Sequence, residues 1–111
     1  MRGVIIEESL EDPSLLKSTR IAKTEIGASL GWHLHTVEVQ DKAFPAFVER
    51  AKRAIKPKWY MHFWKGNRIT AIFQGKSFQF DYKDKKTWKE VLAYGRSLGI
   101  PEEQLNFPIE S

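Results

Sequence analysis

Cysteine is absent from this chain of 111 residues, and its absence excludes disulfides, thiolate metal sites and a cysteine nucleophile. Long apolar runs are absent too, since no stretch approaches the ~20 apolar residues that span a bilayer. The N-terminal segment has only the short apolar run Val4-Ile5-Ile6 before two glutamates, which is far less than the apolar region of a signal peptide. We therefore expect a cytoplasmic protein that makes no contact with a membrane.

Catalytic and nucleotide-binding motifs are also missing. The sequence contains no Gly-x-Ser-x-Gly elbow, no phosphate loop and no dinucleotide fingerprint. Two acidic pairs, Glu7-Glu8 and Glu102-Glu103, are adjacent in sequence, and adjacent residues of a strand point to opposite faces. The sequence therefore favours a non-catalytic protein without a cofactor, although it does not exclude an enzyme.

The overall composition is that of an ordinary folded domain, with 41% hydrophobic and 29% charged residues. No linker or low-complexity segment interrupts it. A chain of this length can bury a core without metal or disulfide support. We expect one domain that spans residues 1–111.

Positive charge is concentrated in the middle of the chain. Residues 1–40 hold four Lys/Arg against six Asp/Glu, whereas residues 41–100 hold fourteen against five. Such a basic segment is typical of proteins that bind polyanions, but solvated helix faces and strand ends have the same composition. Five cations follow one another closely in a basic helix patch: Arg50, Lys52, Arg53, Lys56 and Lys58.

Residues 59–82 predict three antiparallel strands, 59–65, 68–74 and 77–82. Their connections, Gly66-Asn67 and Gly75-Lys76, each place glycine where a two-residue hairpin loop requires a positive φ. Three further strands are expected near residues 3–9, 19–27 and 32–40, with one helical turn at Pro13–Lys17.

Two amphipathic helices complete the pattern. The first starts at Asp41 and has an apolar stripe, and the second starts at a Thr87–Glu90 capping box and ends at Gly99. The order is β-β-β-α-β-β-β-α. It predicts an α+β two-layer sandwich, in which a mostly antiparallel sheet of 5–6 strands carries both main helices on one face.

The expected register assigns the side chains of residues 59–82 to two faces. Trp64, Phe73, Phe78 and Phe80 share one face, which we expect under the helices. The opposite face has an apolar centre within a polar rim, which is typical of an interaction surface. Another strand, the loop at 27–31 or the C-terminal tail is an alternative cover for it. We call this set the open sheet face: Trp59, Met61, Phe63, Lys65, Arg68, Ile72, Gln74 and Gln79.

Histidines are the only residues that suggest a metal. His33 and His35 lie two apart on one strand, so they share a face and could both bind an ion, with His62 as a third ligand. Strand histidines are commonly structural, and we expect no bound metal.

Three functions follow. The first is a binding or self-associating protein that uses the open sheet face, with itself or another protein as partner. The second is single-stranded nucleic-acid binding, with Trp59 and Phe63 as stacking surfaces beside Arg68. The third is a small metal-dependent enzyme built around His33, His35 and His62.

Overall fold

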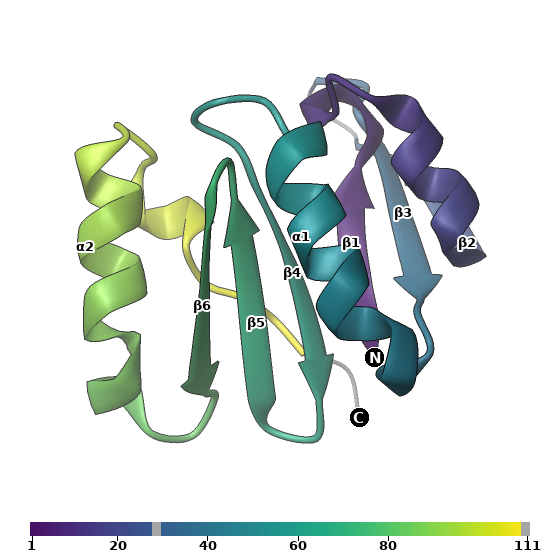
Figure 1. Cartoon of the computed structure of the whole chain (residues 1–111). Helices are drawn as coiled ribbons and strands as arrows, with labels where there is room; N and C mark the ends of the chain where they lie inside the picture. Colours follow the sequence, from purple (N-terminus) through teal and green to yellow (C-terminus); the bar gives the residue numbers. More distant parts are fainter. Residues whose placement is uncertain (28–29, 110–111) are drawn as a thin grey trace.

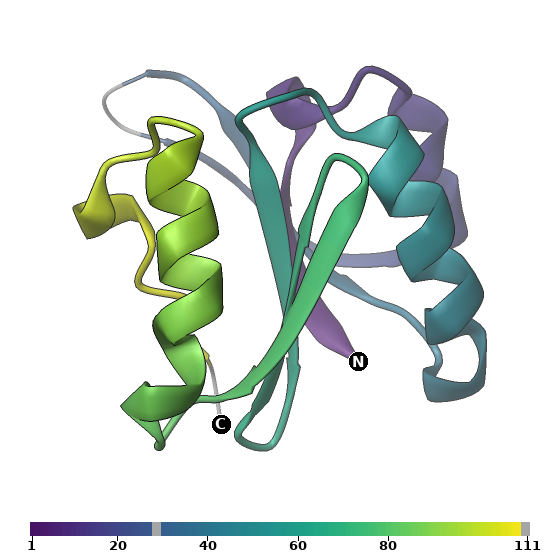
Figure 2. The same cartoon turned by 60° about the vertical axis from the view of Figure 1, so that its left-hand side comes forward.

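The computed structural model describes residues 1–27 and 30–109, which form a six-stranded antiparallel sheet with one main helix on each side (Figures 1 and 2). The strands lie in the order β2-β3-β1-β4-β5-β6. The main elements are β1 Arg2–Ile6, β2 Arg20–Ile26, β3 His33–Glu38, α1 Phe44–Ala54, β4 Tyr60–Lys65, β5 Arg68–Phe73, β6 Lys76–Asp81 and α2 Lys89–Ser97. Short 3-10 turns are η1 Glu7–Ser9, η2 Pro13–Ser18, η3 Asp41–Ala43, η4 Lys85–Trp88 and η5 Glu102–Gln104.

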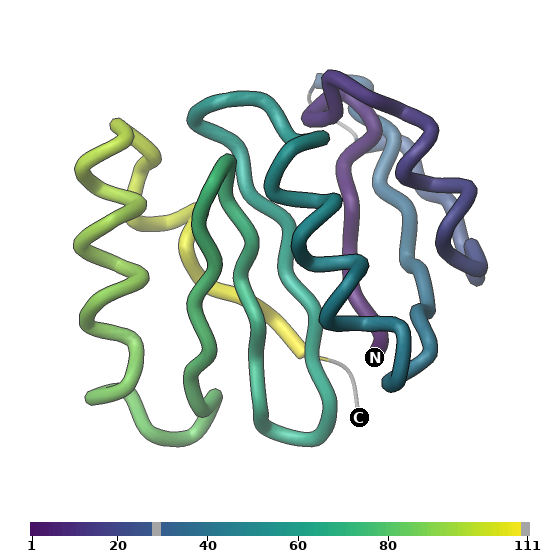
Figure 3. Tube along the Cα trace, in the orientation of Figure 1, coloured from purple at the N-terminus to yellow at the C-terminus, as the bar shows by residue number. Residues whose placement is uncertain are grey.

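The predicted α+β class, element order and antiparallel sheet are confirmed. The chain trace shows β1 between β3 and β4, so the two halves of the chain meet at the β1–β4 pair (Figure 3). The segment after α2 crosses behind the sheet on the side away from α1 (Figure 3). Within the described residues, no helix is long and apolar enough to cross a bilayer.

The three consecutive strands β4, β5 and β6 form a meander. It has the predicted faces, with one correction to its second turn. Lys65 pairs with Arg68 around Gly66, as predicted. The second turn is formed by Gln74 and Gly75, because Phe73 pairs with Lys76. Gly75 has a φ of 74°, a value that glycine adopts without strain. The β5–β6 register differs from the expected one by two residues, so the side chains of these two strands keep their predicted faces.

The two helices cover opposite faces of the sheet, which corrects the prediction that both lie on one. Helix α1 packs on the face of Phe63, whose ring centroid lies 5.3 Å from those of Phe44 and Phe47. Helix α2 packs on the other face, where Tyr94 lies 5.1 Å from Phe73. The described residues therefore form two hydrophobic clusters, separated by the sheet.

The start of α2 also differs from the prediction, whereas its end does not. Asp84 accepts a hydrogen bond from the Lys86 backbone N–H and caps the preceding η4 turn. The Thr87 hydroxyl instead accepts from the Asp81 backbone N–H, which ties this turn to β6. Gly99, with a φ of 84°, ends the helix as predicted.

Truncation of Phe63 tests whether α1 covers this face of the sheet. Phe63 is completely buried and Phe80 is 3% exposed on the opposite face, so Phe63→Ala and Phe80→Ala should each lower the free energy of unfolding by ~3–5 kcal/mol. Ile26, which is 68% exposed, provides the control. Ile26→Ala should change the free energy of unfolding by less than ~0.5 kcal/mol. Urea denaturation measures all three. A Phe63→Ala effect as small as that of Ile26→Ala would contradict the position of α1.

Candidate functional site

The open sheet face is not open at its centre. Met61, Phe63 and Ile72 are at most 1% exposed, because α1 covers them. This cover is none of the three that the sequence suggested, although residues 28 and 29 of the 27–31 loop lie outside the described part. Trp59 is half-buried at the end of the sheet, while the polar rim is exposed: Lys65, Arg68, Gln74 and Gln79. Phe63 therefore cannot stack on a nucleic-acid base, and this face has no apolar centre for a partner protein.

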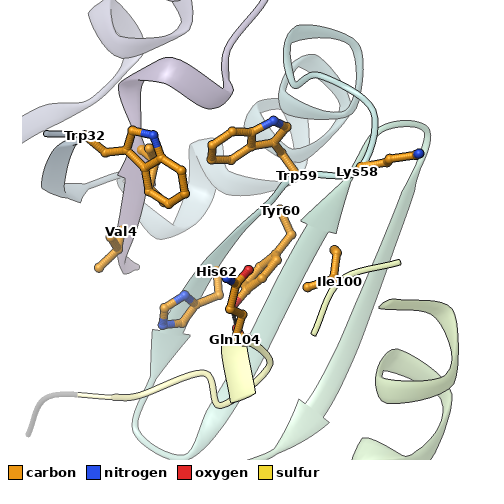
Figure 4. Close-up of a pocket in the computed structure, with 9 residues that line it drawn as sticks. Val4, Trp32, Lys58, Trp59, Tyr60, His62, Ile100 and Gln104 are labelled. Carbon is orange, nitrogen blue, oxygen red and sulfur yellow. Dashed lines mark hydrogen bonds between the residues drawn. The ribbon is translucent and has the colours of Figure 1, made fainter. Parts of the chain in front are cut away.

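A cavity of about 370 Å³ lies on the opposite face, between the β1–β4 strands and the segment that follows α2 (Figure 4). Helix α2 packs over β5 and β6. Phe107 of the C-terminal segment covers part of β4, where its ring centroid lies 5.1 Å from that of Tyr60. Val4 and Ile6 of β1 stay only half-buried on this side. The lining residues are Val4, Ile6, Trp32, Lys58, Trp59, Tyr60, His62, Ile100 and Gln104.

Two tryptophans form the aromatic wall of this cavity. Trp32 precedes β3 and Trp59 precedes β4, and their rings meet edge to face with centroids 4.9 Å apart (Figure 4). The turn before β4 sets this geometry, since Trp59 donates its backbone N–H to the Lys56 carbonyl and Lys58 has a φ of 68°. A positive φ is unfavourable for lysine, so packing around the turn must maintain it. The Trp32–Trp59 pair is what sequence reasoning missed, because no local pattern connects residues 27 positions apart.

Hydrogen bonds and burial determine the polar character of the cavity. The Pro108 carbonyl can only accept, so His62 Nε2 donates to it over 2.8 Å and Nδ1 is the acceptor nitrogen of the neutral ring. Burial lowers the pKa of His62, which favours this neutral form. Tyr60 donates its hydroxyl to the Gln104 carbonyl, and burial raises its pKa to about 12. At neutral pH, Lys58 is thus the charged side chain among the lining residues.

The three histidines that the sequence offered as an alternative metal site do not come together. Within β1, Ile5 pairs with His35 and Val4 pairs with His62, and neighbouring residues of a strand face opposite sides. His35 therefore lies on the α1 side of the sheet and His62 on the α2 side. A metal site made of His33, His35 and His62 is wrong for this topological reason.

His33 and His35 instead contact two glutamates. His33 Nδ1 lies 2.7 Å from Glu8 Oε2, and His35 Nε2 lies 2.8 Å from Glu7 Oε1. We expected the adjacent glutamates to diverge on a strand, but β1 ends at Ile6 and η1 turns both carboxylates toward β3. Hydrogen bonds from the His33 ring and backbone lower the pKa of Glu8 to about 2, and the Glu8 carboxylate raises that of His33. We call these four residues the Glu–His cluster.

The basic helix patch lies on the exposed side of α1 and the turn after it. Arg50 donates to the Ser18 hydroxyl and Lys52 pairs with Glu49 at 2.9 Å, whereas Arg53 and Lys58 are exposed and Lys56 is half-buried. Because Lys58 also lines the cavity, this patch continues to the cavity's edge.

Comparison of the chain with protein-family models, with curated proteins and with solved structures gives no match.

His62 should make stability depend on pH. Its folded pKa lies below its ordinary value of 6.5, so between these two values the unfolded chain binds more protons than the folded one. The free energy of unfolding should therefore fall as pH drops through 6.5 toward the folded pKa. In His62→Gln, which keeps a donor for Pro108, this contribution should disappear.

Urea denaturation of both proteins at pH 7.5, 6.5 and 5.5 measures the effect. Subtracting the two curves removes the titration of His33, which both proteins share. The excess stability of the wild type over His62→Gln should shrink as pH falls. A difference that is constant over this range would contradict a depressed pKa.

Proposed function

We propose that the protein is a non-catalytic binding protein whose cavity takes a planar aromatic molecule with a negative charge. The observation that carries this proposal is the Trp32–Trp59 pair, which stands beside Lys58 at one end of the cavity. The cavity volume of about 370 Å³ suits a small organic ligand rather than a macromolecular surface. Aromatic walls favour a flat ring through edge and face contacts.

The charge of the ligand is inferred from the lining. Lys58 is the charged lining residue, and the buried, neutral His62 adds no second charge to the lining. The Lys58 ammonium points away from the tryptophans, so the charged group of the ligand would lie at the mouth while its ring lies inside (Figure 4). His62 Nδ1 would accept a hydrogen bond from a donor on the ring.

A matched pair of probes tests ring and charge separately. We expect 2-naphthoate to quench the intrinsic tryptophan fluorescence saturably, and 2-naphthylmethylammonium, with the same ring and the opposite charge, to bind at least about tenfold more weakly. Trp32→Ala should weaken the binding of both probes by about fivefold or more, since an aromatic stack contributes ~1–3 kcal/mol. Equal affinity for the two probes, or no saturable binding of either, would contradict the proposal.

Substitution of Lys58 isolates the charge contribution. Lys58→Asn removes the ammonium and places at this positive φ a residue that tolerates it better than lysine does. We expect about fivefold weaker binding of 2-naphthoate and no loss for neutral 2-naphthylmethanol. Lys42→Gln, in the turn η3 after β3, removes an exposed lysine outside the cavity and should leave both affinities unchanged.

The continuity of the basic helix patch with the cavity supports a second candidate, single-stranded nucleic acid. One base would enter the cavity, and Lys58, Lys56 and Arg53 would contact the phosphates. An oligothymidylate should then bind with an affinity that falls steeply between 50 and 200 mM salt, as a result of counterion release. Arg53→Gln should weaken the binding of the oligonucleotide but not that of 2-naphthoate. Salt-independent affinity would exclude this candidate.

A further inference from the structure

The Glu–His cluster lies on the other side of the sheet from the cavity, and its ligating atoms converge. One carboxylate oxygen of Glu7, one of Glu8 and a ring nitrogen of His33 all lie within 4.8 Å of one another. Around a tetrahedral zinc ion, with ligands at ~2.0–2.1 Å, such atoms stand roughly 3.3 Å apart. The 2.7 Å contact between Glu8 and His33 would need to open by about 0.6 Å. All three side chains are at least a third exposed, so they have room for this adjustment.

The partners of these side chains orient them as outer-shell groups orient metal ligands. Glu8 Oε1 accepts the His33 backbone N–H over 2.8 Å, which turns Oε2 toward the ring of the same histidine. Glu7 Oε1 contacts His35 Nε2, and His35 Nδ1 lies 2.8 Å from the Thr24 hydroxyl. His35 is only 8% exposed, so its ring is fixed by packing and by hydrogen bonds at both nitrogens.

From this geometry we propose that Glu7, Glu8 and His33 bind one divalent metal ion, with zinc as the preferred one. Two carboxylates and one imidazole are an oxygen–nitrogen donor set that suits zinc, and three protein ligands leave a coordination position for water. The ion would replace the proton between His33 Nδ1 and Glu8 Oε2. His35 acts as a positioning residue that holds Glu7. This proposal is independent of the ligand proposed for the cavity.

Zinc binding to the untagged full-length chain tests the site. After equilibration with zinc chloride and dialysis against metal-free buffer, we expect one zinc per chain by elemental analysis. Cobalt(II) in place of zinc should give the intense visible absorption of a four-coordinate site. Glu8→Gln and His33→Gln should each lose the retained zinc and the cobalt spectrum. Both variants alter exposed side chains, and circular dichroism verifies that they fold.

Two further variants separate the proposed roles. His35→Gln should weaken zinc binding about tenfold without abolishing it, as expected for a residue that acts through a ligand. His62→Gln, which removes the histidine on the opposite face, should leave zinc binding unchanged. Less than one zinc per chain in the wild type would show that the cluster consists of two carboxylate–imidazole pairs alone. Full retention in Glu8→Gln and His33→Gln would place the ion elsewhere. Either result overturns the proposal.

Discussion

The burial of β4 and β5 on both faces is the constraint on which the rest of this structure depends. Phe63 is completely buried on one side of the sheet and Phe73 on the other. A strand pair of this kind needs a covering layer on each side. A layer on one face only would leave the large aromatic side chains of the other face in water. Helix α1 supplies one layer, and α2 with the C-terminal segment supplies the other.

The second layer is smaller than the sheet that it covers, and the cavity results from this difference. Helix α2 and Phe107 protect β5, β6 and part of β4. Val4 of β1 is only half-buried on this side, and every residue of β2 is exposed. The cavity lies at the boundary between the covered and the uncovered half. Trp32 and Trp59 come from loops at the strand ends, where side chains can approach each other without following the sheet register.

Local patterns in the sequence predicted the elements well, and the reason is visible in particular residues. Gly66 and Gly99 have the positive φ values that their positions required, and the alternation in residues 59–82 placed Phe73 and Phe80 on one face. The second turn was misplaced by one residue, which shifts the β5–β6 register by two, and a periodicity of two cannot detect such a shift. Periodicity also cannot tell which helix covers which face, and for that reason both were assigned to the side of Phe73.

The residues of the two candidate sites were harder to predict because they depend on contacts that are distant in sequence. His33 and His35 were recognised as a pair on one face, but their partners are 25 and 28 residues away, in a turn that interrupts the expected strand. His62 was grouped with them although the β1–β4 pairing, which the sequence alone does not define, puts it on the other side. The assignment of ligands thus required the strand order.

The cavity and the Glu–His cluster share their backbone support. Trp32 and His33 are consecutive, as are Ile6 and Glu7, and in each pair one residue lines the cavity and the next belongs to the cluster. Two hydrogen bonds fix this junction: the Gly27 backbone N–H donates to the Trp32 carbonyl, and the His33 backbone N–H donates to Glu8. The end of β1 and the start of β3 therefore position an aromatic wall on one face of the sheet and carboxylate and imidazole groups on the other. The end of β1 and the start of β3, rather than the flat face of the meander, bring together the residues on which both proposals rest.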